Sequence, residues 1–160
     1  MNILYIHQYF TTPAESAATR SYWIAQEFIK RGHHVTMISS TSGEKHPEGV
    51  ENIDGIEVHY VLNPYSNYMS APRKVWAFVN FIRLAIREAK QQKNVDLVYA
   101  TSTPLTIGYI AMRLKTKKKW PYVFEVRDLW PEFPIQIGAI KNKMAIRFLR
   151  SMERKIYRRS

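Results

Sequence analysis

The chain has 160 residues, of which 46% are hydrophobic and 23% charged, a composition typical of one globular domain rather than of a disordered or fibrous protein. It has no cysteine, which excludes disulfides, cysteine-ligated zinc, iron–sulfur clusters and thiol catalysis. Lysine and arginine outnumber aspartate and glutamate by 24 to 13, giving a net charge of +11. This excess favours an anionic partner such as nucleic acid, anionic lipid or a phosphorylated substrate.

The first part of the chain alternates apolar segments with polar, turn-rich ones. Its start lacks the basic residues and cleavage site of a signal peptide and predicts a strand instead. No apolar run approaches the roughly 18 residues needed to span a bilayer. In order, the patterns predict a buried strand at 2–7, a loop at 11–19, a helix ending at Gly32, a strand at 35–39, a polar and turn-rich segment at 41–55, and a strand at 56–62.

The second part continues this alternation with longer helical segments. In order, it predicts a loop at 63–73, a helix with an apolar stripe from Val75 to Ile86, a strand at 96–100, a helix that begins at Thr101–Pro104 and runs to about Leu114, a strand at 122–126, a kinked segment between Pro131 and Pro134, and a basic amphipathic helix from Lys141. The whole pattern predicts an α/β fold, a three-layer domain with a mostly parallel sheet. Ligands of such sheets bind at the carboxyl ends of the strands, which directs attention to the loops at 7–19, 39–45, 101–104 and 127–134.

The loop after the first predicted strand is a candidate anion site. No glycine precedes Arg31, so neither G-x-G-x-x-G nor a P-loop is present, and a dinucleotide site of that kind is not expected. Small residues lead instead into a helix N-terminus, where exposed amides suit an anion and Arg20 can add a bidentate phosphate contact. The alternative is an ordinary loop in which Ser16 or Thr19 caps the helix.

A charged segment, Glu125 to Glu132, follows the last predicted strand. Its carboxylates can accept hydrogen bonds from sugar hydroxyls, and Trp130 offers an apolar face for a sugar ring. The alternative, which spacing alone favours, pairs Arg127 with Asp128 or Glu125 as a structural contact and places Trp130 in the core. His7 ends the first strand and either reaches this site or satisfies its own hydrogen bonds; none of the five histidines has metal-motif spacing.

The positive charge is concentrated in two clusters. Residues 141–160 hold eight basic side chains and a single acidic one, Glu153, and residues 113–119 hold five basic side chains and no acid. Each cluster is either a surface for an anionic partner or a solvated face.

Several segments, in their order and spacing, resemble the start of a family 4 glycosyltransferase, and the resemblance covers nearly the whole chain. The most specific is Phe124-Glu125-Val126-Arg127-Asp128-Leu129-Trp130-Pro131-Glu132. The others are the opening Ile3 to Phe10, the loop closing on Ala18-Thr19-Arg20, the helix ending in Lys30-Arg31-Gly32-His33-His34-Val35-Thr36, the segment Asp96 to Ser102, and the closing helix with Glu153, Arg154, Tyr157, Arg158 and Arg159.

The resemblance implies a two-domain GT-B architecture. Its N-terminal Rossmann-like domain binds the acceptor, and its C-terminal domain binds a nucleotide-sugar, largely through Glu-x7-Glu. No glutamate in this chain is followed by another eight positions later. We therefore expect residues 1–160 to be a single acceptor-binding domain truncated from a longer two-domain protein and inactive alone. We expect no cofactor and no metal in this domain, with the nucleotide-sugar held by the missing domain.

The resemblance also assigns residue roles. Many members have His-Asp where this chain has Arg127-Asp128. Arginine cannot transfer a proton near neutral pH, so we expect Arg127 to act electrostatically and Asp128 to orient or accept from the acceptor hydroxyl. Members retain anomeric configuration, with catalysis mainly by positioning and charge stabilisation. The expected acceptor-binding residues are Trp130, Glu132, Ser102, Thr103 and His7, and the expected loop facing the donor phosphates contains Ala14, Glu15, Ser16, Thr19 and Arg20.

Many relatives glycosylate lipid-linked acceptors at a membrane surface, which suggests a role in membrane binding for the basic clusters. We expect a lipid-linked or saccharide acceptor in cell-surface polysaccharide synthesis, an anionic membrane surface bound through basic residues, and a cytoplasmic location at the inner face of the membrane. Tyr65, Tyr68 and Met69, next to Arg73, Lys74 and Trp76, are a second candidate membrane contact. The alternative for that loop is a simple crossover packed on the sheet. The rival hypothesis is a basic nucleic-acid- or membrane-binding α/β module without catalysis. No nucleic-acid docking motif is present, so nucleic acid is not an expected partner. A small regulatory α/β domain is a third alternative, but the acidic pocket usual after its first strand is missing.

Overall fold

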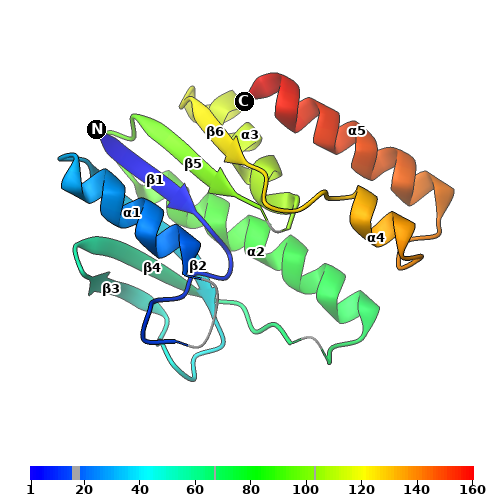
Figure 1. The fold of residues 1–160 in the computed structure, drawn as a ribbon, viewed down its shortest axis with the longest axis horizontal. Helices are drawn as coiled ribbons and strands as arrows, with labels where there is room; N and C mark the ends of the chain where they lie inside the picture. The colour runs from blue at the N-terminus through cyan, green and yellow to red at the C-terminus, as the bar shows by residue number, and fades with distance from the viewer. Residues whose placement is uncertain (16–18, 67, 103) are drawn as a thin grey trace.

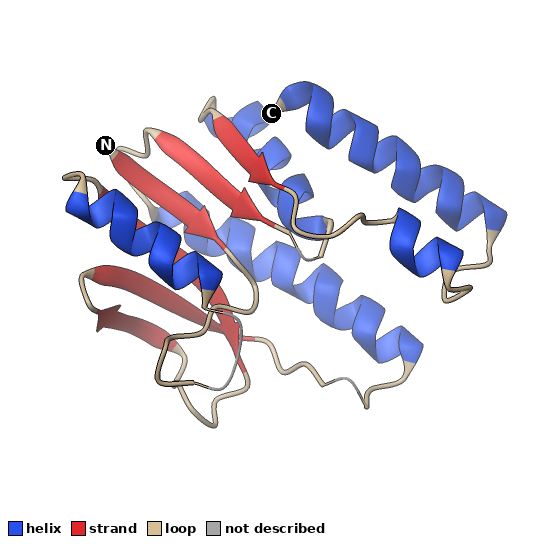
Figure 2. Cartoon of the chain, in the orientation of Figure 1, coloured by secondary structure: helices blue, strands red, loops and turns tan. Residues whose placement is uncertain are grey.

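The computed structural model describes residues 1–15, 19–66, 68–102 and 104–160, which form a six-stranded sheet flanked by helices (Figures 1 and 2). Thr103 and Ser16, two of the expected site residues, lie outside the described residues. The elements in chain order are β1 Asn2–Ile6, α1 Arg20–Lys30, β2 His34–Thr41, β3 Gly49–Ile53, β4 Ile56–Leu62, α2 Ala71–Gln91, β5 Leu97–Thr101, α3 Thr106–Lys118, β6 Tyr122–Glu125, α4 Glu132–Gln136 and α5 Lys143–Arg159.

The sheet has the strand order β3-β4-β2-β1-β5-β6. β1 lies between β2 and β5 and is parallel to both, and β4 and β6 continue the parallel pairing outward. β3 alone among the described strands is antiparallel, on β4. This confirms the expected fold, a three-layer α/β domain with a mostly parallel sheet, because parallel strands need the helical crossovers that the sequence pattern contained.

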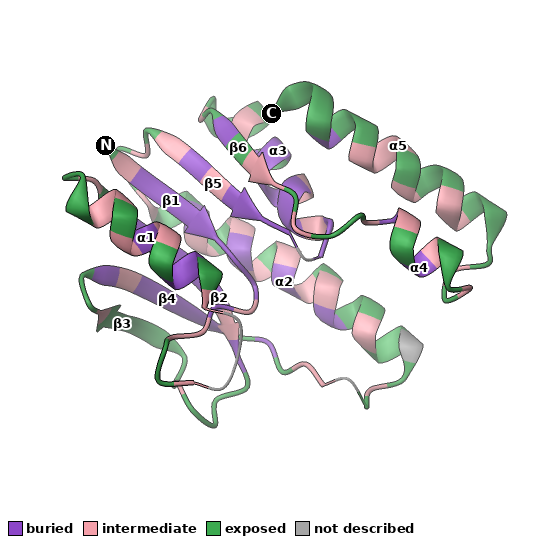
Figure 3. Cartoon of the chain, in the orientation of Figure 1, coloured by how far each residue is buried: buried purple, intermediate pink, exposed green. Residues whose placement is uncertain are grey.

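Two hydrophobic clusters lie on the two faces of the sheet. In β1, Leu4 and Ile6 pack into a cluster with residues of α2, α3 and α5, whereas Tyr5 packs into a second cluster with residues of α1. Successive side chains of a strand point to opposite faces, so β1 is buried on both sides, as a helix-covered parallel strand should be. Figure 3 shows this burial concentrated in β1, β2, β4 and β5.

α3 and α5 approach each other closely at Gly108. A Cβ atom at this position would lie 2.7 Å from Ile156 and 2.9 Å from Phe124, so only a glycine fits without displacement. Ile156 is fully buried, and its carbonyl accepts a 2.6 Å hydrogen bond from the Tyr122 hydroxyl. These contacts hold α5 against β6 and leave most of the helix exposed (Figure 3).

Two predictions about the elements were wrong. Residues 41–55 were expected to be a polar, turn-rich segment with no strand, but Gly49–Ile53 form β3. Its side chains are almost all exposed, so the alternation that reveals a half-buried strand is missing. An Asp54-Gly55 turn with positive φ at both residues joins it to β4, a frequent hairpin turn. The helix expected from Pro104 begins at Thr106 and extends to Lys118, four residues past the expected end.

Candidate functional site at the carboxyl end of the sheet

The candidate residues meet where the parallel strands end. The arrowheads of β1, β5 and β6 point to one edge of the sheet (Figure 1). His7 follows β1, Ser102 follows β5, and the segment 126–132 follows β6. The topology therefore brings together residues that the sequence separates by about a hundred positions, as expected for this class of sheet.

Glu125, the last residue of β6, connects three elements at this edge. Its side chain is 9% exposed. Oε2 accepts a 2.7 Å hydrogen bond from the Thr101 hydroxyl, and Oε1 lies 2.7 Å from Nε of Arg20, an ion pair without hydrogen-bond alignment. The Thr101 hydroxyl also lies 2.9 Å from that of Tyr5. Burial raises the pKa of Tyr5, and the Glu125 charge raises it further, so Tyr5 stays a neutral phenol.

Of the two alternatives for Arg127, a pair with Asp128 or with Glu125, the second is not formed; Glu125 is paired with Arg20 instead. Arg20, at the first turn of α1, remains 63% exposed. Its planar guanidinium has further N–H groups beyond the one at Nε. The ion pair ties the start of α1 to the end of β6 and holds the guanidinium at the sheet edge.

Ser102 fixes the segment that follows β6. Its hydroxyl accepts a 2.9 Å hydrogen bond from the backbone N–H of Arg127, and its own N–H donates to the Glu125 carbonyl at 3.0 Å. Ser102 is almost fully buried. In this geometry Ser102 positions the backbone of Arg127.

His7 is buried and already hydrogen-bonded. Its Nδ1 lies 2.6 Å from the Ser21 hydroxyl, and its backbone N–H donates to the Ile38 carbonyl at 3.1 Å. Burial, assisted by the positive charge of Arg127, lowers the pKa of His7 to about 3. The imidazole is therefore neutral at physiological pH, and the structure agrees with the interpretation of His7 as a satisfied strand-end residue.

A hollow of about 460 Å³ lies beside the segment after β6. Glu132, at the start of α4, makes a two-pronged ion pair with Arg150 of α5, with N–O distances of 2.9 and 3.0 Å. Trp130 is partly buried against the hydrophobic core and also lines the hollow. The hollow is lined by Arg127, Asp128, Leu129, Trp130, Glu132, Phe133 and Gln136. It thus combines a cation, two carboxylates and an aromatic face.

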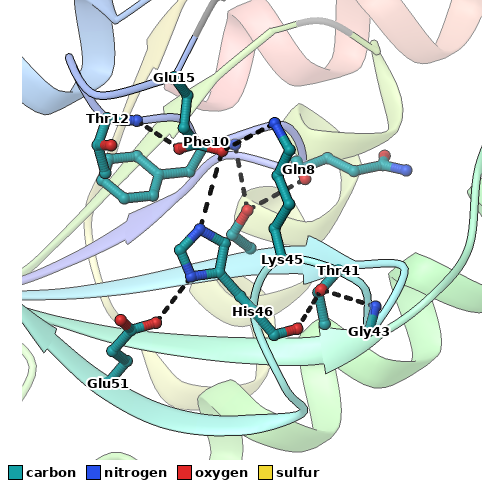
Figure 4. A network of polar contacts seen from close by, with 10 residues as sticks. Gln8, Phe10, Thr12, Glu15, Thr41, Gly43, Lys45, His46 and Glu51 are labelled. Carbon is teal, nitrogen blue, oxygen red and sulfur yellow. Dashed lines mark hydrogen bonds and ion pairs between the residues drawn. The ribbon is translucent and has the colours of Figure 1, made fainter.

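The loop before α1 is fastened to the β2–β3 loop through Glu15 (Figure 4). Oε2 of Glu15 accepts a 2.8 Å hydrogen bond from the Thr12 amide. Oε1 lies 3.8 Å from both Nζ of Lys45 and Nε2 of His46, and Nδ1 of His46 lies 2.8 Å from a Glu51 oxygen. Glu15 therefore points toward this network, and Ala14 is exposed beside it.

Thr19 occupies the N-cap position of α1, but its side chain makes no capping hydrogen bond. The alternative that Thr19 caps the helix is therefore wrong. Its backbone has φ −94° and ψ 11°, whereas a capping side chain needs an extended residue to reach the amides of the first turn.

The contacts of Lys45 and His46 escaped the sequence analysis. They lie about thirty residues from Glu15, and neither their spacing nor their types form a motif. The proximity of the loop at 39–45 to the same sheet edge was the one available signal. Among the described residues, no group of three His, Asp or Glu side chains is arranged to hold a metal ion. In the described part of the chain, no helix has the length and apolarity to cross a membrane.

The comparisons with known proteins agree with this architecture. The family model of the glycosyl transferase 4-like domain matches residues 16–160. A search among curated proteins finds no match. Among solved structures, sucrose-phosphate synthase from Thermosynechococcus elongatus superposes with a TM-score of 0.66 and 14% identity, over 97% of this chain and 39% of that protein. The C-terminal domain of a hydrogenase from Pyrococcus furiosus superposes with a TM-score of 0.54 and 15% identity, over 78% of this chain and 89% of that one.

At such low identities the two structures show the fold alone, and this chain spans about two fifths of the sucrose-phosphate synthase. The match of the family model is different in kind, because it rests on the sequence and covers most of the chain. The resemblance noted in the segment after β6 is thus confirmed at the level of the family. This chain belongs to the family of glycosyl transferase 4-like domains.

Proposed function

We propose that this chain is the acceptor-binding, N-terminal domain of a longer GT-B enzyme that transfers a sugar with retention of configuration. The donor is a nucleotide-sugar bound mainly by a second domain, and the acceptor is a lipid-linked compound or saccharide used in cell-surface polysaccharide synthesis. The observation that carries the proposal is the family match over residues 16–160. The chain's 39% coverage of sucrose-phosphate synthase is what one domain of a larger enzyme would give.

The proposed acceptor site is the hollow after β6. Asp128 there orients the acceptor hydroxyl or accepts its proton, and Arg127 stabilises the charge that develops as the nucleoside diphosphate leaves. The new bond joins the acceptor oxygen to the anomeric carbon on the face from which the diphosphate departs. Trp130 and Glu132 shape the pocket for the acceptor. The chemistry in this domain is positioning and electrostatics.

The proposed donor-facing element is the loop before α1, together with Arg20. Arg20 keeps exposed guanidinium surface while paired with Glu125, so it is placed to contact a phosphate that approaches the sheet edge. Glu15 accepts a hydrogen bond from the Thr12 amide and lies 3.8 Å from both Lys45 and His46. This arrangement supports a loop whose part up to Glu15 is held against the β2–β3 loop, beside the proposed position of the donor diphosphate.

The basic residues are proposed to hold the enzyme at the cytoplasmic face of an anionic membrane. Each Lys or Arg near such a surface contributes about 1 kcal/mol. α5 supports this role because all but one of its residues retain some exposure, and its basic side chains are exposed (Figure 3). Of the second candidate contact, Tyr68 is 99% and Trp76 60% exposed, whereas Tyr65 packs against Tyr9 and Phe78.

The test uses the complete protein, assayed for sugar transfer with a panel of nucleotide-sugars. Arg127→Ala and Asp128→Asn should each lower kcat by a hundredfold or more, within the usual range for a positioned acid–base or electrostatic group. Glu44→Gln, an exposed change in the β2–β3 loop, serves as the control and should leave kcat unchanged. Activity within a few-fold of wild type in both variants would remove these residues from the mechanism. If the complete protein neither transferred a sugar from any nucleotide-sugar nor hydrolysed one, that result would contradict the proposed function.

A further inference from the structure

An apolar groove separates α2 from α5 on the helical face opposite α1. Its volume is about 410 Å³, and the surface that its lining exposes is entirely apolar. The walls include Val75 and Val79 of α2, Phe148 and Leu149 of α5, and Trp130 between them. We call this feature the α2–α5 groove.

The side chains of the groove and its neighbours are exposed to an unusual degree. Phe148 is 66% exposed and Val75 60%, and the adjacent Trp76 and Met144 are 60% and 82% exposed. Single exposed apolar residues are common on protein surfaces, but a contiguous patch around a groove marks a binding surface. Its occupant must therefore contribute apolar surface.

The charges on the same two helices identify the head group of that occupant. α2 carries five basic side chains and one acid, Glu88, and α5 carries seven basic side chains and one acid, Glu153. Of these cations, Arg150 is already paired with Glu132. An apolar chain attached to an anionic group satisfies both features. A second copy of this chain does not, because two copies of the same cationic face repel each other.

Trp130 connects the groove to the candidate site. Its side chain lines both the groove and the hollow that contains Arg127 and Asp128. A molecule with a polar, phosphate-bearing head in the hollow would therefore reach the groove with its tail by passing a single side chain. We propose that the α2–α5 groove holds the hydrocarbon chain of an anionic, lipid-linked acceptor. This inference rests on the proposed function and specifies its acceptor class.

The test measures binding of n-dodecyl phosphate, kept below its micelle concentration, and of n-hexyl phosphate to the complete protein by isothermal titration calorimetry. The double variant Val79→Gln/Phe148→Gln makes the groove polar at two exposed positions without changing charge. Val50→Gln, at an exposed position of the distant strand β3, is the matched control. Since each buried methylene adds to affinity, wild type and control should bind the dodecyl compound at least tenfold more tightly than the hexyl one. The double variant should lose most of this difference.

Equal affinity for the two chain lengths, or an unchanged preference in the double variant, would overturn the inference. So would a dimer in sedimentation velocity that the double variant dissociates, because the groove would then bind a second copy. Binding to vesicles of phosphatidylcholine and phosphatidylglycerol that depends on the groove, with no binding of dodecyl phosphate, would assign the groove to the bilayer instead and also overturn it.

Hydrolysis of the nucleotide-sugar, measured in parallel, needs no lipid acceptor and should be the same in wild type and double variant. Wild-type protein that hydrolyses the nucleotide-sugar but shows no chain-length preference would count against the groove alone. An absence of hydrolysis in wild type would count against the proposed function, while the calorimetry would still decide what the groove binds.

Discussion

At the residue scale, the Glu125 carboxylate accepts a hydrogen bond from the Thr101 hydroxyl of β5 and forms an ion pair with the Arg20 guanidinium of α1. Removing its charge leaves Arg20 without its partner and weakens the contact with Thr101. We expect Glu125→Gln to lower the free energy of unfolding by about 1–3 kcal/mol, the usual range for hydrogen bonds to a buried charged group. Urea unfolding measures this change. The matched control is Glu27→Gln, whose partner Lys30 lies on the surface, and it should leave the unfolding midpoint in place. Equal changes in the free energy of unfolding would show that the Glu125 contacts stabilise the fold no more than the exposed pair of Glu27 and Lys30.

His7, also at the residue scale, makes the free energy of unfolding depend on pH. Its pKa is lowered to about 3 in the fold, against about 6.5 in an unfolded chain. The fold therefore favours the neutral imidazole, and stability that is complete above pH 6.5 is lost as the pH falls toward 3. The slope from this group is at most about 1.4 kcal/mol per pH unit. Urea unfolding between pH 7 and pH 4.5 should show a smaller loss in His7→Gln than in wild type. Parallel losses would mean that His7 does not titrate in this range.

At the scale of secondary-structure elements, the close contact between α3 and α5 depends on the absence of a side chain at Gly108. Gly108→Ala would place a Cβ atom 2.7 Å from Ile156 and 2.9 Å from Phe124. Overpacking of this kind costs about 1–3 kcal/mol, more than the roughly 1 kcal/mol that alanine gains over glycine in a helix. Thermal unfolding should give a lower Tm for Gly108→Ala. The control is Arg113→Ala, an exposed change on the same helix, which should keep the Tm near that of wild type. A raised Tm in Gly108→Ala would show that α5 moves aside freely.

The two basic clusters lie on different helices, α5 and α3, and this separation allows a charge-matched comparison. Lys143→Gln/Arg147→Gln should weaken binding of the complete protein to vesicles with 30% anionic lipid by about tenfold or more, at roughly 1 kcal/mol per residue. Lys117→Gln/Lys118→Gln removes the same charge from the C-terminal end of α3 and should have a smaller effect. Cosedimentation at low and high salt measures both. Equal losses would indicate attraction by net charge alone, and tighter binding to duplex DNA than to vesicles would favour the rival nucleic-acid module.

Across the whole molecule, the sequence predicted what local patterns can encode. The alternation of buried strands and amphipathic helices predicted the parallel sheet, and the segment 124–132 predicted the family. β3 was missed because an exposed edge strand carries no apolar alternation. The pairing of Arg20 with Glu125 was missed because it joins positions over a hundred residues apart. Such contacts depend on which strands become neighbours, which no local spacing determines.

The two outermost strands also affect how the molecule behaves in a crowded solution. β3 has five residues and β6 four; of the inner strands, β2 and β4 have eight and seven, and β1 and β5 have five each. An open sheet edge offers unpaired backbone groups to any other chain and is a usual starting point for aggregation. Short edges present few such groups, and a charge of +11 keeps copies apart. We therefore expect high solubility at low salt and a narrower margin against aggregation once salt screens the charge.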